Sequence, residues 1–341
     1  MNSKPLVSII VNNYNYDRFL AEAVDSALNQ TYPHTEVVVV DDGSTDSSHQ
    51  IIASYSDLIV PIIKPNGGQA SAFNHGVAAS SGEIICFLDA DDTFSPDKVT
   101  RVIELISQID REPPYALFHN LGFIDRDSKS LESNKPQSCE LADLNYHRAI
   151  NQSSQAINKV CSAMEVYQHA QKYRYVPFLG SATSSLILSR SLAEIIFPLP
   201  CEAVKTSADD FVVKAAALVG EIYSSELVLG GYRIHGDNYW YGNKRYQPKE
   251  FLVNLDCYLN SILEKTQRNS VLAYFNSLYA KNYLKVNFGN NRYQKELLIL
   301  AFKVVTWHTD VRTIKFFIKT ISEVLYSAVF WHRIFNQKQM Q

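Results

Sequence analysis

Three carboxylates stand together in the segment Asp89-Ala90-Asp91-Asp92, directly after the apolar run 84–88. A short, unbroken apolar run is typical of a buried strand in a parallel sheet. Beyond the aspartates, Ser95 and Pro96 open an amphipathic run to Ile109, which predicts a helix. Like charges this close repel each other unless a cation joins them, and Mg²⁺ or Mn²⁺ would bind through such oxygen ligands. We interpret the segment as a metal site; the simpler alternative is an acidic turn that caps a helix.

A second acidic strand end lies upstream, at Asp41-Asp42, where the β-branched run 36–40 predicts a strand. The first predicted strand, 6–11, also runs into a polar loop, which carries Asn12 and Tyr14. Open α/β sheets bind ligands at the carboxyl ends of their parallel strands. These side chains are therefore expected at one edge of the sheet.

Strands and helices alternate through roughly the first 110 residues. Apolar spacing predicts a helix at 19–28, and a third strand at 58–63 is followed by a turn and a helix at about 69–79. This alternation predicts an α/β domain with a mainly parallel sheet and helices on both faces. Later elements are expected as strands at 115–118, 185–188 and within 226–235, and as helices at 156–171, 191–196 and from Asp209-Asp210 onward.

The second half of the chain has a weaker pattern. We interpret residues 125–175 as largely a variable, substrate-facing insert. From about residue 248 long helical patterns replace the strands, so we expect a catalytic domain at 1–245 and a helical C-terminal region at 246–341. The part from Lys303 onward mixes basic with apolar residues, which suits a helical tail packed on its own domain or peripheral contact with an anionic membrane face.

Composition excludes several classes of protein. A formal charge of −3 over 341 residues offers no basic field for nucleic acid. Five widely spaced cysteines without a C-x-x-C pair argue against a disulfide framework and a structural zinc site. With no secretory signal pattern and no apolar run near the roughly 20 residues that span a bilayer, we expect a cytoplasmic protein, with any membrane contact peripheral on the inner face.

Taken together, the segments 7–15, 40–46, Asn74-His75-Gly76 and 82–92 resemble the family 2 glycosyltransferases, inverting enzymes with the GT-A fold. They match in order and spacing over roughly the first 100 residues, and more loosely to about residue 245. The resemblance implies a metal-dependent hexosyltransferase of the kind used in polysaccharide biosynthesis. Such an enzyme moves a sugar from a nucleotide-sugar donor, with a UDP-sugar favoured, to a hydroxyl of a saccharide or lipid-linked acceptor.

The resemblance also implies which residues bind the donor. Asp42 would accept the imide N–H of uracil or thymine, with Asn12 and Tyr14 lining the base, and Asn74 would contact the donor as well. Asp89 would lie near the ribose and the waters of the metal.

The remaining roles concern the metal and the proton. Asp91 would bind Mg²⁺ or Mn²⁺, which neutralises charge on the departing diphosphate. His235 would be a further metal or diphosphate ligand, with a purely structural hydrogen-bonding role as the alternative. A base must take the proton from the acceptor hydroxyl, and we assign it to Asp210, with Asp209 as the alternative.

One position departs from the family pattern. Many members carry an Arg directly before the Asn of the 69–79 helix, where this chain has Phe73. We therefore do not rely on an Arg-mediated donor contact there. Residues 66–69 are candidates to line the donor pocket instead, with a plain turn as the alternative.

Two other functions fit parts of the sequence. The segment Asp89-Ala90-Asp91-Asp92-Thr93 matches the nucleophile loop of haloacid-dehalogenase-type phosphohydrolases, in which Asp89 would attack phosphorus and Asp91 would act as the acid. That class carries the loop on its first strand, whereas here it follows the fourth predicted strand. A non-catalytic nucleotide-sugar-binding protein is the second alternative. A dinucleotide-binding dehydrogenase is excluded because no G-x-G-x-x-G follows the first strand.

Overall fold

The structure, a computed structural model, describes residues 4–131, 156–173, 175–201, 205–236, 238, 249–269 and 318. The first of two compact units comprises residues 1–170 and 176–270, and the second comprises residues 171–175 and 271–341. The predicted site residues all belong to the first unit.

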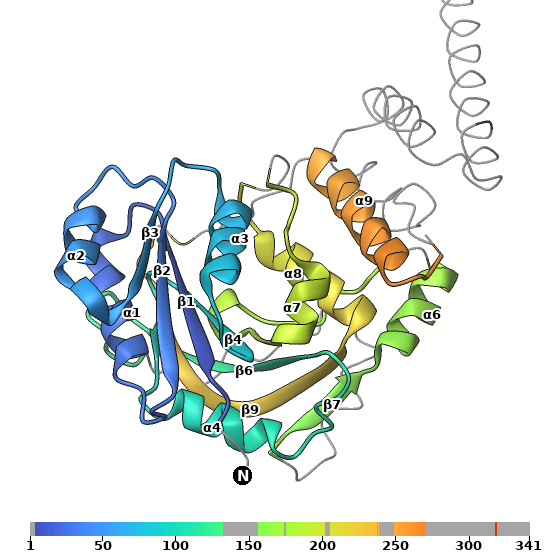
Figure 1. Cartoon of the computed structure of the whole chain (residues 1–341), viewed down its shortest axis with the longest axis horizontal. Helices are drawn as coiled ribbons and strands as arrows, with labels where there is room; N and C mark the ends of the chain where they lie inside the picture. The colour runs from blue at the N-terminus through green and yellow to red at the C-terminus, as the bar shows by residue number, and fades with distance from the viewer. Residues whose placement is uncertain are drawn as a thin grey trace, which may run out of the picture. The chain divides into compact units, whose positions relative to one another are not determined.

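Nine strands of the described chain pair into one mixed sheet in the order β3-β2-β1-β4-β8-β6-β9-β5, with β7 paired to β9 (Figure 1). The strands are β1 (Val7–Asn13), β2 (Thr35–Asp41), β3 (Val60–Ile63), β4 (Ile84–Asp89), β5 (Thr93–Phe94), β6 (Tyr115–Ile124), β7 (Asn158–Cys161), β8 (Ile187–Ser189) and β9 (Glu221–Arg233). The helices are α1 (Asp17–Leu28), α2 (Ser48–Ser54), α3 (Gln69–Ala79), α4 (Lys98–Ile106), α6 (Ala163–Tyr173), α7 (Arg190–Ile196), α8 (Ala208–Val219) and α9 (Lys249–Lys265), with 3₁₀ turns η1 (Ser56–Leu58) and η2 (Thr183–Ser185).

The first four strands run parallel, and their register sets the site. In the pairing of β1 with its two neighbours, Asn13 lies opposite Asp41 and Asn12 lies opposite Asp89. The carboxyl ends of β1, β2 and β4 therefore meet at one edge, as expected for parallel strands. The predicted α/β fold with a mainly parallel first half is confirmed.

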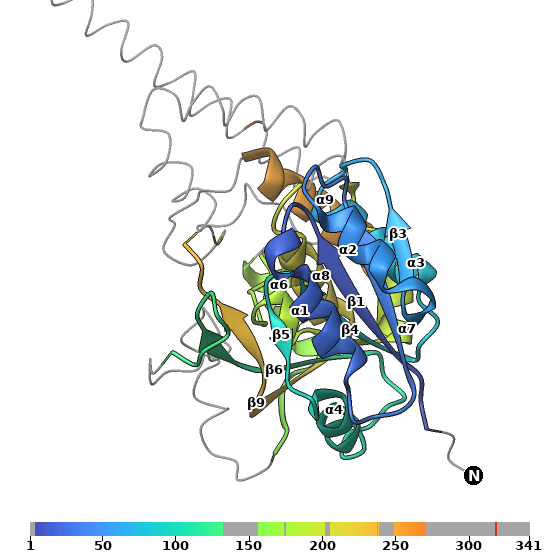
Figure 2. The same ribbon diagram turned by 90° about the vertical axis from the view of Figure 1, so that its left-hand side faces the viewer.

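Helices cover both faces of this parallel half. Val7, Ile9 and Val11 alternate toward the face with α1 and α4, the side turned to the viewer in Figure 2. Ile10 points to the other face, where α3 approaches so closely that a Cβ at Gly76 would lie 2.4 Å from Cγ2 of Ile10. Because Gly76 has no side chain, α3 can pack directly on β1.

Strand pairing in the second half of the sheet fixes the position of the acidic turn, residues 89–92. β8 is antiparallel to β4 and β6, whereas β6 and the long β9 are parallel. The two residues of β5 pair with Gly230 and Gly231 of β9. Residues 89–92 therefore lie between β4 and β5. Because both strands are paired in the sheet, both ends of the turn are held in place.

Two predicted elements differ from the structure. The helix expected from Ser95 begins at Lys98 and ends at Ile106, because the Ser95 backbone N–H pairs with the Leu229 carbonyl and extends the contact with β9. The helix expected at 156–171 is a strand, β7, followed by α6. Residues 158–161 are drawn into the sheet by pairing with β9, a tertiary contact that local spacing does not report.

The C-terminal part is described through α9, which packs on α8 by contacts of Phe251 and Tyr258 with Phe211. No helix among the described residues has the length and apolar character needed to cross a membrane. Residues 132–155 of the predicted insert and the basic tail lie outside the described residues, apart from Ile318. The domain boundary at 245/246 stays a prediction.

Candidate active site

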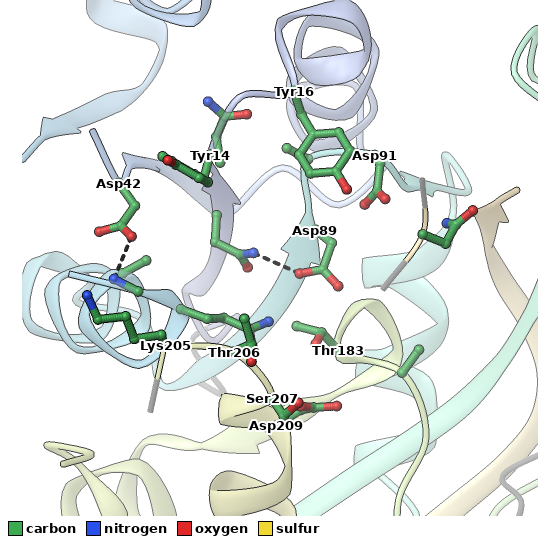
Figure 3. Close-up of a pocket in the computed structure, with 18 of the residues that line it drawn as sticks. Tyr14, Tyr16, Asp42, Asp89, Asp91, Thr183, Lys205, Thr206, Ser207 and Asp209 are labelled. Atoms are coloured by element: carbon green, nitrogen blue, oxygen red, sulfur yellow. Dashed lines mark hydrogen bonds between the residues drawn. The ribbon is translucent and has the colours of Figure 1, made fainter. Parts of the chain in front are cut away.

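A cavity of about 470 Å³ opens at the carboxyl ends of β1, β2 and β4 and at the start of α8 (Figure 3). Four carboxylates from three separate parts of the chain line it: Asp42, Asp89, Asp91 and Asp209. Among the lining residues that the structure describes, Lys205 is the one basic residue. Figure 3 shows Asp42 and Lys205 on one side of the cavity and Asp91 on the other.

The three aspartates of the acidic turn lie close together but have different surroundings. One carboxylate oxygen from each of Asp89, Asp91 and Asp92 lies within 4.8 Å of the others. Asp92 is buried and accepts hydrogen bonds from Ser184 Oγ at 2.6 Å and from the Arg233 backbone N–H at 2.9 Å. Asp92 therefore anchors the turn, and Asp89 and Asp91 line the cavity.

Asp89 is held in place by a neighbouring strand. Asn12 Nδ2 donates to Asp89 Oδ1 at 2.7 Å. Burial first, and then the charge of Asp91, raises the pKa of Asp89 to about 7. Repulsion of this kind is relieved when a hard cation joins the carboxylates. The oxygen donors, their closeness and their burial fit Mg²⁺ or Mn²⁺.

His235 reaches Asp91 rather than the cavity wall. Its Nε2 lies 3.0 Å from Asp91 Oδ2, and its ring packs edge-on against Tyr16 at 5.6 Å between centroids. The backbone N–H of His235 donates to the side-chain oxygen of Asn238 at 2.9 Å. This arrangement fixes one oxygen of Asp91, so His235 orients a predicted metal ligand. Direct ligation by His235 stays a prediction.

Arg233 ties the same turn to the rest of the sheet. Its side chain is fully buried and donates from Nε to the Asp91 carbonyl at 2.7 Å and from Nη2 to Glu22 Oε2 at 2.6 Å. Nη1 donates to the carbonyls of Asp125 and Arg126. A guanidinium is suited to this task because it offers five donors in one plane.

Replacing Arg233 with Met is expected to destabilise the protein by about 3 kcal/mol, since buried carbonyl groups lose their donor. Arg233→Lys should recover only part of this loss, because an ammonium cannot reach several acceptors in one plane. Thermal unfolding of the purified variants measures the effect. Arg101→Met is the control: Arg101 is 49% exposed and pairs only with exposed carboxylates among the described residues, so its loss should cost well under 1 kcal/mol. Equal unfolding temperatures for wild type and Arg233→Met would contradict the anchoring role.

Asp42 lines the other side of the cavity. Its Oδ2 accepts the Gly68 backbone N–H at 2.7 Å, and its Oδ1 accepts the Gly67 N–H at 3.0 Å and pairs with the Lys64 ammonium. A carboxylate oxygen can accept two hydrogen bonds, so Oδ2 retains capacity for a ligand. Asn12 and Tyr14 also line the cavity, as expected for residues that flank a bound base.

The two aspartates at the start of α8, Asp209 and Asp210, have different surroundings. Asp209 lines the cavity, and its Oδ1 is buried without a hydrogen-bond partner among the described residues. Burial, followed by the charges of Asp210 and Asp89, raises the pKa of Asp209 to about 7. Asp210 instead lies 3.4 Å from the Lys214 ammonium and is not among the lining residues. The structure thus brings Asp209, rather than the first candidate Asp210, into the cavity.

Asn74 is not among the residues that line the cavity, and its predicted contact with the donor stays a prediction. Its amide nitrogen donates to the Leu199 carbonyl and to Cys201 Sγ, both at 2.9 Å, and its amide oxygen accepts the Leu199 N–H at 2.7 Å. Both ends of the side chain are therefore occupied in fastening α3 to the segment before α8.

Several lining residues were not predicted: Tyr16, Thr183, Lys205, Thr206 and Ser207. The last three directly precede the acidic pair, so their place before a helix start was a usable signal. Thr183 belongs to η2, which reaches the site only because β8 pairs with β4. No local pattern in the sequence indicates that contact.

Comparison with known proteins agrees with this geometry. Residues 8–128 match the family model for glycosyl transferase family 2. An uncharacterized glycosyltransferase of Nostoc sp. is 34% identical over 237 residues, which are 68% of this chain and 66% of that protein.

Two crystal structures of S. aureus TarS residues 1–349 are similar in fold. The complex with UDP has a TM-score of 0.51 at 18% identity and covers 84% of this chain and 73% of that one. The complex with UDP-GlcNAc has a TM-score of 0.51 at 15% identity and covers 94% and 80%.

The chain therefore belongs to the family 2 glycosyltransferases. Its sheet and covering helices form the GT-A fold, as the resemblance implied. The alignment covers 66% of the Nostoc relative, so what the whole protein acts on is a matter for proposal.

Proposed function

We propose that this protein transfers a sugar, with inversion and with the help of a divalent metal, from a UDP-sugar to a hydroxyl of a saccharide or lipid-linked acceptor. The observation that carries the proposal is one cavity lined by Asp42, Asp89, Asp91 and Asp209. These residues come from the ends of β2 and β4 and from the start of α8. Such a site offers a base pocket, a metal site and an acid–base group at once.

The donor would lie along the row of carboxylates. Asp42, with a lone pair left on Oδ2, would accept the imide N–H of uracil, and the half-exposed Tyr14 would cover the base. UDP is the favoured nucleotide because TarS, which shares the fold, was crystallised with UDP and with UDP-GlcNAc. UDP-GlcNAc is accordingly the first donor to test.

Asp91 and Asp89 would hold Mg²⁺ or Mn²⁺. When bound, the cation supplies neutralising charge to the departing diphosphate. The residues of the chain orient these ligands: His235 fixes one oxygen of Asp91, and Asn12 fixes one oxygen of Asp89. The buried Asp92 keeps the turn in place.

A carboxylate of the acidic pair would take the proton from the acceptor hydroxyl. The resemblance assigns this role to Asp210, whereas the geometry favours Asp209, whose free oxygen and raised pKa suit a base that works near neutral pH. The acceptor class, a cytoplasmic location and peripheral membrane contact stay predictions.

The test is a thermal-shift panel of UDP-, dTDP- and GDP-sugars with and without Mn²⁺, followed by an assay of UDP release with saccharide acceptors. We expect a UDP-sugar with Mn²⁺ to raise the unfolding temperature, because a ligand at 100 times its Kd stabilises the folded state by about 2.7 kcal/mol. Binding without UDP release would favour a non-catalytic binding protein. Release of phosphate from a simple phosphate ester, with no response to any nucleotide sugar, would favour the phosphohydrolase.

A further inference from the structure

Gln69 joins two sides of the cavity. It is the first residue of α3, it is half-buried, and it lines the cavity. Its backbone N–H donates to the Lys205 carbonyl at 3.0 Å, and its side-chain oxygen accepts the backbone N–H of Ala208 at 2.9 Å. Gln69 therefore fastens the donor side of the cavity to the first turn of α8, beside Asp209.

The position of this side chain leaves little freedom. Gly68, with φ of 87°, lets the segment before α8 come so close that a Cβ on Gly68 would lie 2.5 Å from the Lys205 Cα. The close approach of this segment thus fixes the position of the Gln69 backbone. The hydrogen bond with Ala208 then fixes the position of its side-chain oxygen.

That hydrogen bond also determines which way the amide is turned. A backbone N–H can only donate, so the atom that faces Ala208 must be the side-chain oxygen and not the NH₂ group. Gln69 Nε2 consequently points away from Ala208. Within the part of the chain that the structure describes, no group accepts a hydrogen bond from it. Two N–H donors are left at the wall of the cavity.

Lys205 is the one basic residue that the described residues place at this cavity, and the other hydrogen-bond donors that line it are neutral. The lining is rich in carboxylates, which accept hydrogen bonds and repel an anionic ligand. Phe73 occupies the position where many family members carry an Arg, and its ring is fully buried 5.0 Å from that of Phe87. A diphosphate or a sugar bound in this cavity needs donors, and Gln69 offers them from a fixed place.

We propose that Gln69 is a donor-binding residue: its amide nitrogen hydrogen-bonds an oxygen of the nucleotide sugar while its amide oxygen secures the start of α8. The proposal rests on the proposed function, and it names a residue that selects the donor within that function. The oxygen belongs either to the diphosphate or to the transferred sugar. An oxygen of either group can accept a hydrogen bond from the amide nitrogen.

Two substitutions separate the two ends of the amide. Gln69→Glu keeps an oxygen for the Ala208 N–H but loses the NH₂ donor, and Gln69→Leu loses both. A third variant, Thr206→Glu, places a new carboxylate on a neighbouring lining residue and serves as the control for added charge. Calorimetric titration with UDP and with UDP-GlcNAc in the presence of Mn²⁺ gives the Kd, and thermal unfolding gives the stability of each variant.

We expect Gln69→Glu to unfold at the wild-type temperature and to bind UDP-GlcNAc at least about 10-fold more weakly. Gln69→Leu should be weakened similarly and should also unfold at a lower temperature. Thr206→Glu should be affected less than Gln69→Glu. A loss seen with both UDP and UDP-GlcNAc assigns the contact to the UDP part of the donor, and a loss confined to UDP-GlcNAc assigns it to the sugar.

Wild-type affinity in Gln69→Glu would overturn the inference and leave the proposed function intact. An equal loss in Thr206→Glu would overturn it too, because added charge alone would then explain the effect. If the wild-type protein binds neither ligand, the proposed UDP-sugar function fails and the inference fails with it.

Discussion

Alanine in place of Asp91 should abolish the Mn²⁺-dependent part of UDP-sugar binding and lower the transfer rate by about 10³-fold, an effect of several kcal/mol on the transition state. Neither Asp89 nor Asp92 can replace Asp91 as a metal ligand, because oxygens of both residues are already used in hydrogen bonds. Both oxygens of Asp92 accept hydrogen bonds from protein groups, and one oxygen of Asp89 is held by Asn12. Titration of the donor at several Mn²⁺ concentrations measures the loss.

Asp97→Ala is the matched control for this substitution. Asp97 lies a few residues along the chain at the start of α4, is about half exposed and pairs with Arg101 on the surface. Its removal should leave metal-dependent donor binding unchanged. Normal transfer by Asp91→Ala would show that the metal, if one is used, is held elsewhere.

The Asp209→Asn variant is expected to bind the UDP-sugar with nearly wild-type affinity and to transfer sugar at least about 10²-fold more slowly, the usual contribution of a positioned base. Asn has nearly the shape of Asp, so the hydrogen bonds at the start of α8 should persist. What is lost is the carboxylate that faces the cavity with a free oxygen. Single-turnover kinetics, which separate binding from chemistry, give both numbers.

Asp210→Asn decides between the two members of the pair. Asp210 is the residue favoured by resemblance, and its carboxylate pairs with Lys214 on the same helix. Lys214→Met, which breaks this pair without touching either carboxylate, is the control for indirect effects. If Asp210→Asn loses transfer while Asp209→Asn does not, the resemblance names the base and Asp209 has a different role at the donor.

The parts of the site that follow from strand register could be predicted from the sequence. Asp42 and Asp89 stand where apolar runs end, and parallel pairing brings such ends to one edge whatever the intervening helices do. The acidic start of α8 could also be recognised, because carboxylates in a first helical turn have a chemical reason to be there.

Contacts that depend on tertiary structure could not be predicted in this way. Asn74 stands in a segment that resembles the family, yet its amide is used by Leu199 and Cys201, more than 120 residues away. The orientation of Gln69 depends on Ala208, at a similar separation. Periodicity and motif spacing report neither partner, because each partner is brought close only by the packing of the folded chain.

The anchoring of Asp92 bears on how this protein can be divided. The region that matches the family model ends at residue 128, but the groups that satisfy the buried Asp92 carboxylate belong to Ser184 and Arg233. A fragment that stopped at residue 128 would keep the carboxyl ends of β1, β2 and β4 and leave the buried Asp92 carboxyl group without these hydrogen-bond donors. The most recognisable third of the sequence is thus not an autonomous module, and a chimera that aims to keep the acidic turn 89–92 in place must carry η2 and β9 with it.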